Sequence, residues 1–235
     1  MKYVGSKGRH VRSILPIVLR NRRADQAYVE PFVGGASMLS AVDGRRIAGD
    51  LHAPLIAMWQ AVSRGWSPRS HPEVLDSKFY ARCKLMAKQG SLDPIVAFMG
   101  FSLSFGGKWF GGFRNDPSGR RDYVAEALRA ADDQFLRLIG VDFHHSSYKD
   151  LPIPDRSVIY CDPPYRGTLG YATGAFDHDA LWQWCRAKRS EGHDIFVSEY
   201  SAPSDFECVW EKAVKSTLDR DTGAKAAIER LYRLC

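Results

Sequence analysis

The residues best suited to chemistry form the stretch Val158–Tyr165, which reads Val-Ile-Tyr-Cys-Asp-Pro-Pro-Tyr. Its apolar half predicts a buried strand, and the two prolines end that strand. The turn that follows therefore lies where open α/β sheets bind their ligands, at the carboxyl end of a strand. Asp162 and the carbonyl of Pro163 can accept hydrogen bonds, Pro164 stiffens the turn, and Tyr165 offers a flat ring. This set suits a planar ring that bears an amine, although an ordinary proline-rich turn has the same composition.

A second group of candidate residues lies near the N-terminus. The stretch Tyr3-Val4-Gly5-Ser6-Lys7-Gly8 is rich in glycine, which lets the backbone approach a ligand closely, but it lacks the full phosphate-loop pattern. Residues 28–33 predict a strand that ends in Gly34-Gly35, and Asp50 ends the next predicted strand, 47–50. In nucleotide-binding sheets such glycines clear space for the ligand and the acid receives the ribose hydroxyls. The alternative role for Asp50 is the N-cap of a helix around residues 54–59.

A third stretch, residues 105–116, combines four glycines and four aromatic residues with Lys108, Arg114 and Asn115. It is too irregular to form a helix or strand. Aromatic rings among cations suit base stacking and phosphate contact, so Lys108, Trp109, Arg114 and Asn115 are candidates for nucleic-acid binding. The alternative is a loop whose aromatic rings point inward.

Helices and strands alternate in the two outer parts of the chain, which predicts an α/β fold. We expect helices near residues 11–19 (with Pro16 inside), 38–42, 54–59, 79–87, 93–104 and 122–139, and one capped by Asp177; the further strands are expected at 141–144, 158–161, 194–198 and 208–214, with 228–234 as helix or edge strand. The loop 166–176 is long enough to close over a substrate.

Composition sets wider bounds. The chain has 235 residues, a net charge of +6 and no apolar run near the roughly 18 residues that cross a membrane, so we expect a cytoplasmic protein. Cations exceed acids by nine to four in residues 1–63 and by thirteen to ten in 64–150, but not in 151–235, with eleven to thirteen. The excess permits a polyanionic partner. The five cysteines and seven histidines lack metal-ligand spacings, which predicts reduced thiols and no zinc site.

Together these pieces resemble the Dam-type adenine-specific DNA methyltransferases of the alpha class, including phage members. The residues on which this resemblance depends are Asp162-Pro163-Pro164-Tyr165, the motif Glu30-Pro31-Phe32-Val33-Gly34-Gly35, the N-terminal pair Tyr3 and Lys7, and Asp50. The stretch Ser198–Pro203 is similar to one common in phage members. The chain departs from the family at Ala36, often a third glycine, and at Tyr3, commonly Trp.

The resemblance implies a Rossmann-like S-adenosylmethionine-dependent methyltransferase domain, residues 1–63 and 141–235, with a mainly helical target-recognition insertion, 64–140. It implies that S-adenosylmethionine is bound by Tyr3, Lys7, Glu30, Phe32, Gly34, Asp50 and Asp162. It further implies a double-stranded DNA partner inside a bacterial host cell, with base flipping and a monomer assumed. In that setting Asp162 and the Pro163 carbonyl hold the adenine amine and Tyr165 stacks on the base, while Cys161 is a core residue.

Other functions stay open at this point. The same turn can act on the exocyclic amine of cytosine, although a serine in place of Asp162 is commoner there. An RNA base or a free nucleotide is another substrate class. An inactive DNA-binding module, or the specificity part of a restriction system, belongs to a different class, which the presence of Lys7, Asp50, Asp162 and Tyr165 disfavours. The sequence has no convincing acid cluster for a nuclease.

Overall fold

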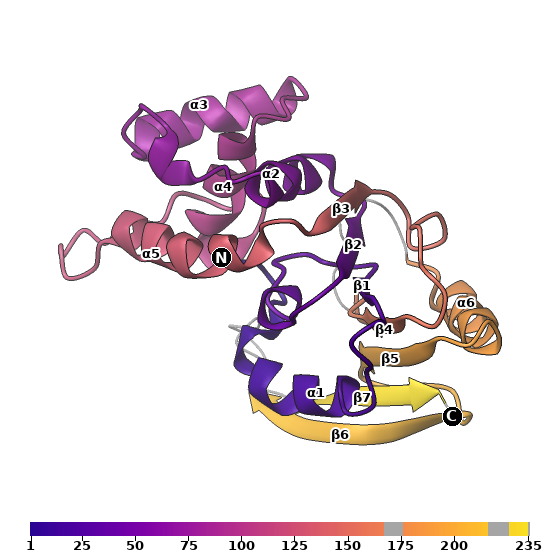
Figure 1. The fold of residues 1–235 in the computed structure, drawn as a ribbon. Coiled ribbons are helices and arrows are strands. Elements are labelled where there is room, and N and C mark those ends of the chain that lie inside the picture. Colours follow the sequence, from indigo (N-terminus) through magenta and orange to yellow (C-terminus); the bar gives the residue numbers. More distant parts are fainter. Residues whose placement is uncertain (167–175, 216–225, 235) are drawn as a thin grey trace. The chain divides into compact units, whose positions relative to one another are not determined.

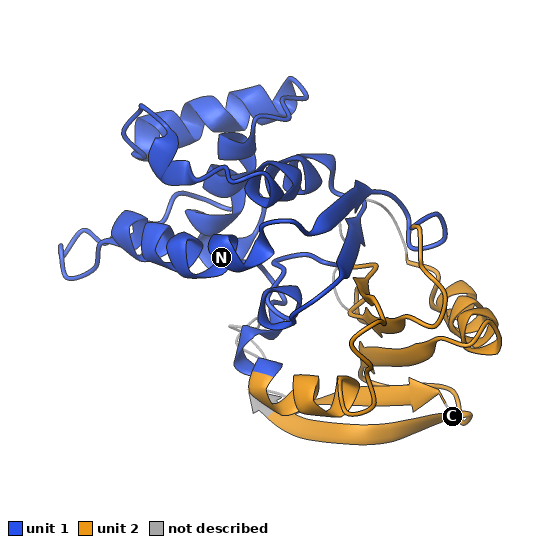
Figure 2. Ribbon diagram, in the orientation of Figure 1, with its two compact units in different colours: residues 1–11, 33–151 blue, residues 12–32, 152–235 orange. Residues whose placement is uncertain are grey.

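A computed structural model describes residues 1–166, 176–215 and 226–234 of the chain. Its contacts divide the chain into two compact units (Figure 2). Unit 1 comprises residues 1–11 and 33–151, and unit 2 comprises residues 12–32 and 152–235. Unit 1 contains Tyr3, Lys7, the Gly34-Gly35 turn, Asp50 and the stretch 105–116, and unit 2 contains Glu30, Phe32 and the turn Asp162–Tyr165.

Unit 1 is built on two parallel strands, β2 (Arg46–Asp50) and β3 (Asp142–His145). Their register pairs Ile47 with Asp142 and Asp50 with His145. Helix α2 (Ala53–Ser63) follows β2 after two residues and buries one apolar side against β3, including Trp59. The short connection fixes where β2 ends, and it places Asp50 beside the start of a helix.

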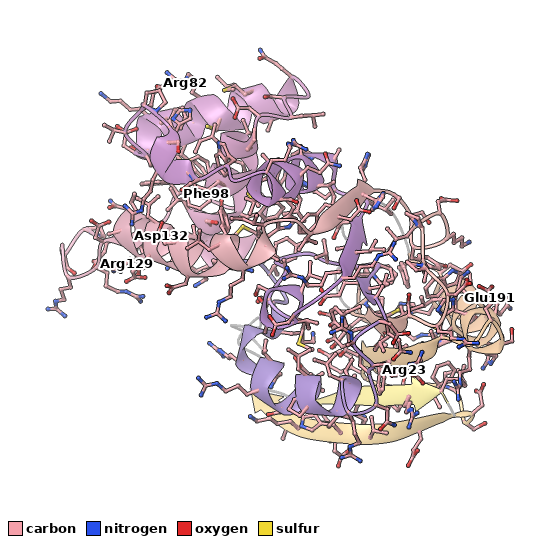
Figure 3. All side chains as sticks on the ribbon, viewed as in Figure 1. Arg23, Arg82, Phe98, Arg129, Asp132 and Glu191 are labelled. Carbon is pink, nitrogen blue, oxygen red and sulfur yellow. The ribbon has the colours of Figure 1, made fainter. Side chains whose placement is uncertain are left out.

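The remaining helices of unit 1 are α3 (Ser77–Lys88), α4 (Pro94–Ser102) and α5 (Tyr123–Phe135). Helix α4 is apolar on all sides and packs against α2 and α3, as expected of a central helix. Figure 3 labels Phe98 on α4, which is fully buried, and Asp132 on α5, which lies at the surface and pairs with Arg69 at 2.6 Å. Most side chains of residues 94–102 are therefore core, and the charges lie on α3 and α5.

Unit 2 contains the strands β1 (Tyr28–Glu30), β4 (Val158–Cys161), β5 (Asp194–Glu199), β6 (Phe206–Lys215) and β7 (Ala226–Leu234), with helix α6 (His178–Ser190) (Figure 1). Their order is β1-β4-β5-β7-β6. The first three are parallel, and β7 pairs antiparallel with both β5 and β6. Helix α1 (Val11–Val18) contains Pro16 and continues into this unit. The parallel strands end at the same edge, which brings the residues after β1, β4 and β5 together.

The predicted fold class, a mainly parallel, Rossmann-like α/β sheet, is confirmed. Two of the expected elements were wrong. Residues 38–42 do not form an α-helix, because only a 3-10 turn, Leu39–Ala41, follows the glycine turn. The C-terminal segment is a strand but not an edge strand, since β7 lies between β5 and β6. Asp177 caps α6 as expected, with its Oδ1 accepting from the N–H of Ala180 at 2.9 Å.

The division into two units differs from the predicted boundary of the recognition insertion. Residues 64–140 share unit 1 with β2, α2 and β3, and α4 packs directly on α2. The insertion thus shares a core with the elements around Asp50, and its separate function stays a prediction. Across the described parts of the chain, each helix is too short or too polar to cross a membrane.

Candidate active site

The glycine turn of unit 1 is held by the carboxylate of Asp50. The Gly34 N–H donates to Asp50 Oδ2 at 3.0 Å, and the His52 N–H donates to Oδ1 at 3.0 Å. On the other side of the turn, Trp59 Nε1 donates to the Gly34 carbonyl at 2.9 Å. Strand β2 and helix α2 thus fix the turn from two directions, and the structure brings Gly34 and Asp50 into contact.

Tyr3 lies directly on this turn. A Cβ added to Gly34 would come within 2.8 Å of the Tyr3 ring, and one added to Gly35 would come within 2.7 Å of the Tyr3 Cβ. Glycine is therefore required at both positions for the ring to lie where it does. Gly34 also has a positive φ of 44°. The structure thus brings the N-terminal aromatic residue and the glycine turn together.

The rest of the N-terminal segment is tied to the same turn. Ser6 Oγ lies 2.7 Å from Ser37 Oγ, and Ser6 also caps the 3-10 turn Lys7–Arg9. Lys7 is buried. Ala36, the departure from the family's third glycine, has a φ of 53° and is fully buried. A left-handed conformation costs an alanine roughly 1 kcal/mol, so the turn keeps a glycine-like shape at some expense.

Asp50 is not the N-cap of α2. That position belongs to His52, whose Nδ1 accepts from the Leu55 N–H at 3.2 Å. Burial raises the pKa of Asp50, against the lowering effect of the backbone N–H groups that it accepts. Burial lowers the pKa of His52 to about 4, consistent with a neutral ring that accepts a hydrogen bond. The helix-cap alternative for Asp50 is therefore wrong, and its carboxylate is left for the turn and a ligand.

The residues of the turn fit a nucleoside-type cofactor such as S-adenosylmethionine. A carboxylate has about four acceptor positions, and the backbone groups of Gly34, His52 and Leu51 contact Asp50. Asp50 is only half-buried, so a remaining position can accept a ribose hydroxyl. The tyrosine ring above two glycines adds a flat apolar surface. This fit rests on the donors and acceptors of the turn.

The second motif, Asp162–Tyr165, follows β4 in unit 2, as predicted. Asp162 and Tyr165 are half-buried and Pro163 is buried. The Tyr165 ring lies edge-on to Tyr200, with centroids 4.6 Å apart. Burial and the nearby Asp162 carboxylate raise the pKa of Tyr165 well above its ordinary value, so the phenol is neutral. Cys161 is fully buried on its strand, as predicted.

Glu30 ends β1, the parallel neighbour of β4. It is buried, and Tyr28 donates its hydroxyl to Glu30 Oε1 at 2.9 Å. Burial raises the pKa of Glu30 to about 8, Tyr28 opposes this rise, and the Asp162 carboxylate adds to it. Two acids of the predicted site therefore influence one another within unit 2. Phe32 lies two residues on and meets Phe176 edge-on, with centroids 5.7 Å apart.

Sequence reasoning missed the acid that holds the second motif in place. Glu199 ends β5 and is 1% exposed. Its Oε1 accepts from the N–H of Arg166 at 2.7 Å, immediately after Tyr165, and Oε2 accepts from the N–H of Tyr200. The signal was available, because Glu199 follows an apolar strand in the same way as Asp50 and Asp162. The rest of the predicted closing loop, 167–175, lies outside the described residues.

The stretch 105–116 is partly buried. Phe110 is buried and Trp109 half-buried, because Gly100 on α4 leaves room for both rings: a Cβ there would lie 2.6 Å from Trp109. Phe105 is 70% exposed, and Lys108 is exposed beside it. The alternative of a loop whose aromatic rings point inward thus holds for Trp109 and Phe110 and not for Phe105.

The two predicted cations of this stretch differ. The Arg114 side chain is 11% exposed, lies over the Tyr123 ring at 4.1 Å and reaches Glu126 at 3.9 Å. Lys108 and Asn115 are exposed. Of the four residues predicted to bind DNA, these two are the most accessible. The DNA-binding role of all four stays a prediction.

Comparison with known families bears on these sites. The family described as D12 class N6 adenine-specific DNA methyltransferase matches residues 3–81. The matched segment contains Tyr3, Lys7, the glycine turn and Asp50, and it ends before Asp162. The resemblance to adenine-specific DNA methyltransferases is confirmed over these residues. The match supports an enzyme of that class, with S-adenosylmethionine as cofactor and DNA as substrate.

Two solved structures are similar to the chain at low identity. The candidate methyltransferase yhhF from Escherichia coli is 13% identical, with 99% of this chain and 88% of that chain covered and a TM-score of 0.39. SMU.472, a candidate methyltransferase complexed with SAH, is 15% identical, with 97% and 52% covered and a TM-score of 0.39. TM-scores at this level establish neither a shared fold nor a shared ligand. No curated protein matches the chain.

Proposed function

We propose that this protein transfers a methyl group from S-adenosylmethionine to the exocyclic amine of adenine in double-stranded DNA. The observation that carries the proposal is the turn Asp162–Tyr165 after β4, which groups two acceptors with an aromatic ring. The family match over residues 3–81 supports the choice of adenine and DNA.

Of the residues expected to contact the cofactor, Tyr3, Lys7, Gly34 and Asp50 lie in unit 1, and Glu30, Phe32 and Asp162 lie in unit 2. Asp50 accepts hydroxyl donors with the acceptor positions that Gly34 and His52 leave unused. When bound, S-adenosylmethionine supplies an electrophilic methyl group. The protein's own task is then to present the amine nitrogen in line with it, which is the largest part of the catalysis we propose.

The amine is presented by the turn after β4. Asp162 and the Pro163 carbonyl each accept a hydrogen bond from one N–H of the amine. These bonds move the nitrogen towards tetrahedral geometry and expose its lone pair. Tyr165 stacks on the base through its neutral ring. Because the target atom is inside a duplex, the base is flipped out before it reaches the turn. Lys108, Trp109, Arg114 and Asn115 contact the DNA, with Lys108 and Asn115 the most exposed of the four.

Labelled cofactor tests this proposal directly. The purified protein is incubated with labelled S-adenosylmethionine and either bacterial or phage DNA, single-stranded DNA or RNA, and the product is sequenced for modified bases. We expect label in duplex DNA as 6-methyladenine. Label in cytosine or only in RNA would replace the substrate that we propose. No transfer to any nucleic acid, with cofactor binding intact, would remove the enzymatic function.

A further inference from the structure

One buried acid outside the predicted site contacts the segment that bears Tyr165. Glu199 is 1% exposed, and burying a carboxylate is costly unless hydrogen bonds compensate it. Its two oxygens accept from the backbone N–H groups of Arg166 and Tyr200, and His178 Nδ1 lies 3.4 Å from Oε1. One of these donors directly follows Tyr165 in the chain, and the other belongs to the residue whose ring touches Tyr165.

Strand register explains why this acid reaches the turn. Strand β4 pairs in parallel with β5, with Cys161 opposite Val197. Continuing that register past the last pair places the residues after Cys161 beside Ser198 and Glu199. Ser198, the residue before Glu199 on β5, also contacts the neighbouring strand β4, since its Oγ lies 2.8 Å from the Tyr160 hydroxyl. The end of β5 therefore supports both the strand before the turn and the turn itself.

The other side of the aromatic pair is also fixed. The Tyr200 carbonyl accepts from Arg230 Nη1 at 2.6 Å and from the Tyr232 hydroxyl at 3.3 Å, both on β7. Tyr200 is thus anchored to the sheet through its carbonyl and to Glu199 through its N–H. Tyr165 lies edge-on to this anchored ring, 4.6 Å away. On the C-terminal side of Tyr165, the Arg166 N–H is held by Glu199.

We propose that Glu199 is a positioning residue that holds the Tyr165 ring, through Arg166 and Tyr200, in the orientation needed to stack on the target base. This inference rests on the proposed methyl transfer. Glutamine at 199 has one carbonyl oxygen and one NH2 group, so it cannot accept from both N–H groups through separate oxygens. The NH2 group would face a backbone donor, and one of the two hydrogen bonds that Glu199 accepts from Arg166 and Tyr200 would be lost.

The test compares Glu199→Gln with two other variants of the full-length protein. Asp205→Asn is the matched control, because Asp205 is an exposed acid of unit 2 whose carboxylate pairs with Arg186 of α6. Asp162→Ala gives the reference for lost chemistry. The readouts are kcat, the Kd for S-adenosylmethionine, the melting temperature, and the fluorescence of 2-aminopurine placed at the target adenine that sequencing identifies.

We expect Glu199→Gln to remain folded, to bind S-adenosylmethionine within about twofold of wild type, and to lose about 10- to 100-fold in kcat, the scale of a small misplacement of a reacting group. Flipped 2-aminopurine should be brighter than with wild type, because Tyr165 no longer quenches it by stacking. Asp205→Asn should match wild type in kcat, in the Kd for S-adenosylmethionine, in melting temperature and in 2-aminopurine fluorescence.

Wild-type kcat and wild-type fluorescence in a folded Glu199→Gln variant would overturn the inference and leave the proposed function standing. A fall in kcat that tracks the melting temperature, with unchanged fluorescence, would make Glu199 a stabilising residue only and would also overturn it. Absence of methyl transfer by the wild type is the separate failure of the proposed function. If Glu199→Gln does not fold, Glu199→Asp, which keeps the charge but shortens the reach, is measured in the same way with the same outcomes.

Discussion

Two acids, Asp50 in unit 1 and Glu199 in unit 2, make the same kind of contact with different consequences. Each ends a strand, and each accepts backbone N–H groups both from just beyond its own strand and from a turn that bears a sequence motif. Asp50 is half-buried, whereas Glu199 is 1% exposed. The hydrogen-bond pattern therefore does not distinguish the two proposed roles, cofactor binding for Asp50 and positioning for Glu199.

Burial makes the difference, for a simple reason. A carboxylate that has acceptor positions to spare and solvent beside it can exchange water for ligand hydroxyls at little cost. A fully buried carboxylate has no such exchange available and acts only on the groups that it already holds. The comparison predicts that changes near Asp50 alter cofactor affinity, and that changes in the turn held by Glu199 alter the chemical step.

The largest effect is expected at the centre of that turn. Asp162→Ala should abolish methyl transfer and leave DNA binding nearly intact, because Asp162 acts on the amine and the cations hold the DNA. Asn keeps an acceptor without the charge, so it should be impaired less than Ala. Single-turnover transfer and a DNA-binding titration measure the two properties. Transfer at the wild-type rate by Asp162→Ala would make the motif a structural turn.

Glu30 should make the free energy of unfolding depend on pH. Its pKa is about 8 in the folded protein and near 4.5 when unfolded, so the folded state binds the extra proton. The contribution of Glu30 is thus complete below pH 4.5 and is lost as pH rises towards 8. Between pH 6.5 and 8 the contribution of Glu30 to the free energy of unfolding should fall by about 2 kcal/mol, while the buried N-terminal amine, whose pKa is lowered to about 6, acts in the opposite direction.

Urea denaturation of wild type and Glu30→Gln at pH 6.5 and pH 8 measures this loss. The variant cannot ionise at this position, so the difference in free energy of unfolding between variant and wild type should shift by about 2 kcal/mol in favour of the variant from pH 6.5 to pH 8. Equal slopes for the two proteins would mean that Glu30 does not titrate in this window.

Asp50→Ala tests the binding side of the comparison. The variant loses the acceptor for the cofactor hydroxyls, so binding of S-adenosylmethionine should weaken by about 1–3 kcal/mol, the scale of a hydrogen bond to a charged group. Calorimetry on the folded variant measures it. Asp132→Ala is the control, because Asp132 lies on α5 at the surface and its carboxylate pairs with Arg69. Unchanged affinity in Asp50→Ala would remove this residue from the cofactor site.

Substitutions of Tyr165 distinguish the role of its aromatic ring from the role of its hydroxyl group. Tyr165→Ala should lose roughly 1–3 kcal/mol of base stacking, whereas Tyr165→Phe should be mild because stacking needs only the ring. The measurement is kcat/KM for the mapped DNA site, and the order expected is wild type, Phe, Ala. A Phe variant as impaired as Ala would assign the role to the phenol oxygen.

The smallest effect is expected in the stretch 105–116. Lys108 is exposed, so Lys108→Ala should lower the slope of log affinity against log salt by about 1, the loss of one phosphate contact. Arg114→Ala should lower it less, because Arg114 is committed to Tyr123 and Glu126. Salt titrations of DNA binding compare the two. An unchanged slope in both would direct attention to the cations of residues 1–63.

Several features of this protein could be predicted from the sequence because they depend on neighbours along the chain. The apolar run before Asp162 ends where proline removes a backbone donor, and Asp177 caps the helix three residues from Ala180. The contact of Gly34 with Asp50 was predictable because a strand, a glycine turn and a second strand form one short unit. Even here the α-helix predicted at residues 38–42 was wrong. After the buried Ala36 the chain forms only a 3-10 turn, Leu39–Ala41, in which Leu39 is buried.

Other features were decided by pairing across long separations. Glu199 reaches Arg166, 33 residues away, only because β4 and β5 pair in parallel in one register. The place of Trp109 depends on Gly100, where the absence of a side chain on α4 leaves room for the ring. Strand β7 lies inside the sheet because it pairs with both β5 and β6. Residue types show which groups can bind or react, but whether an acid keeps contact with solvent or is enclosed depends on which strands lie beside it.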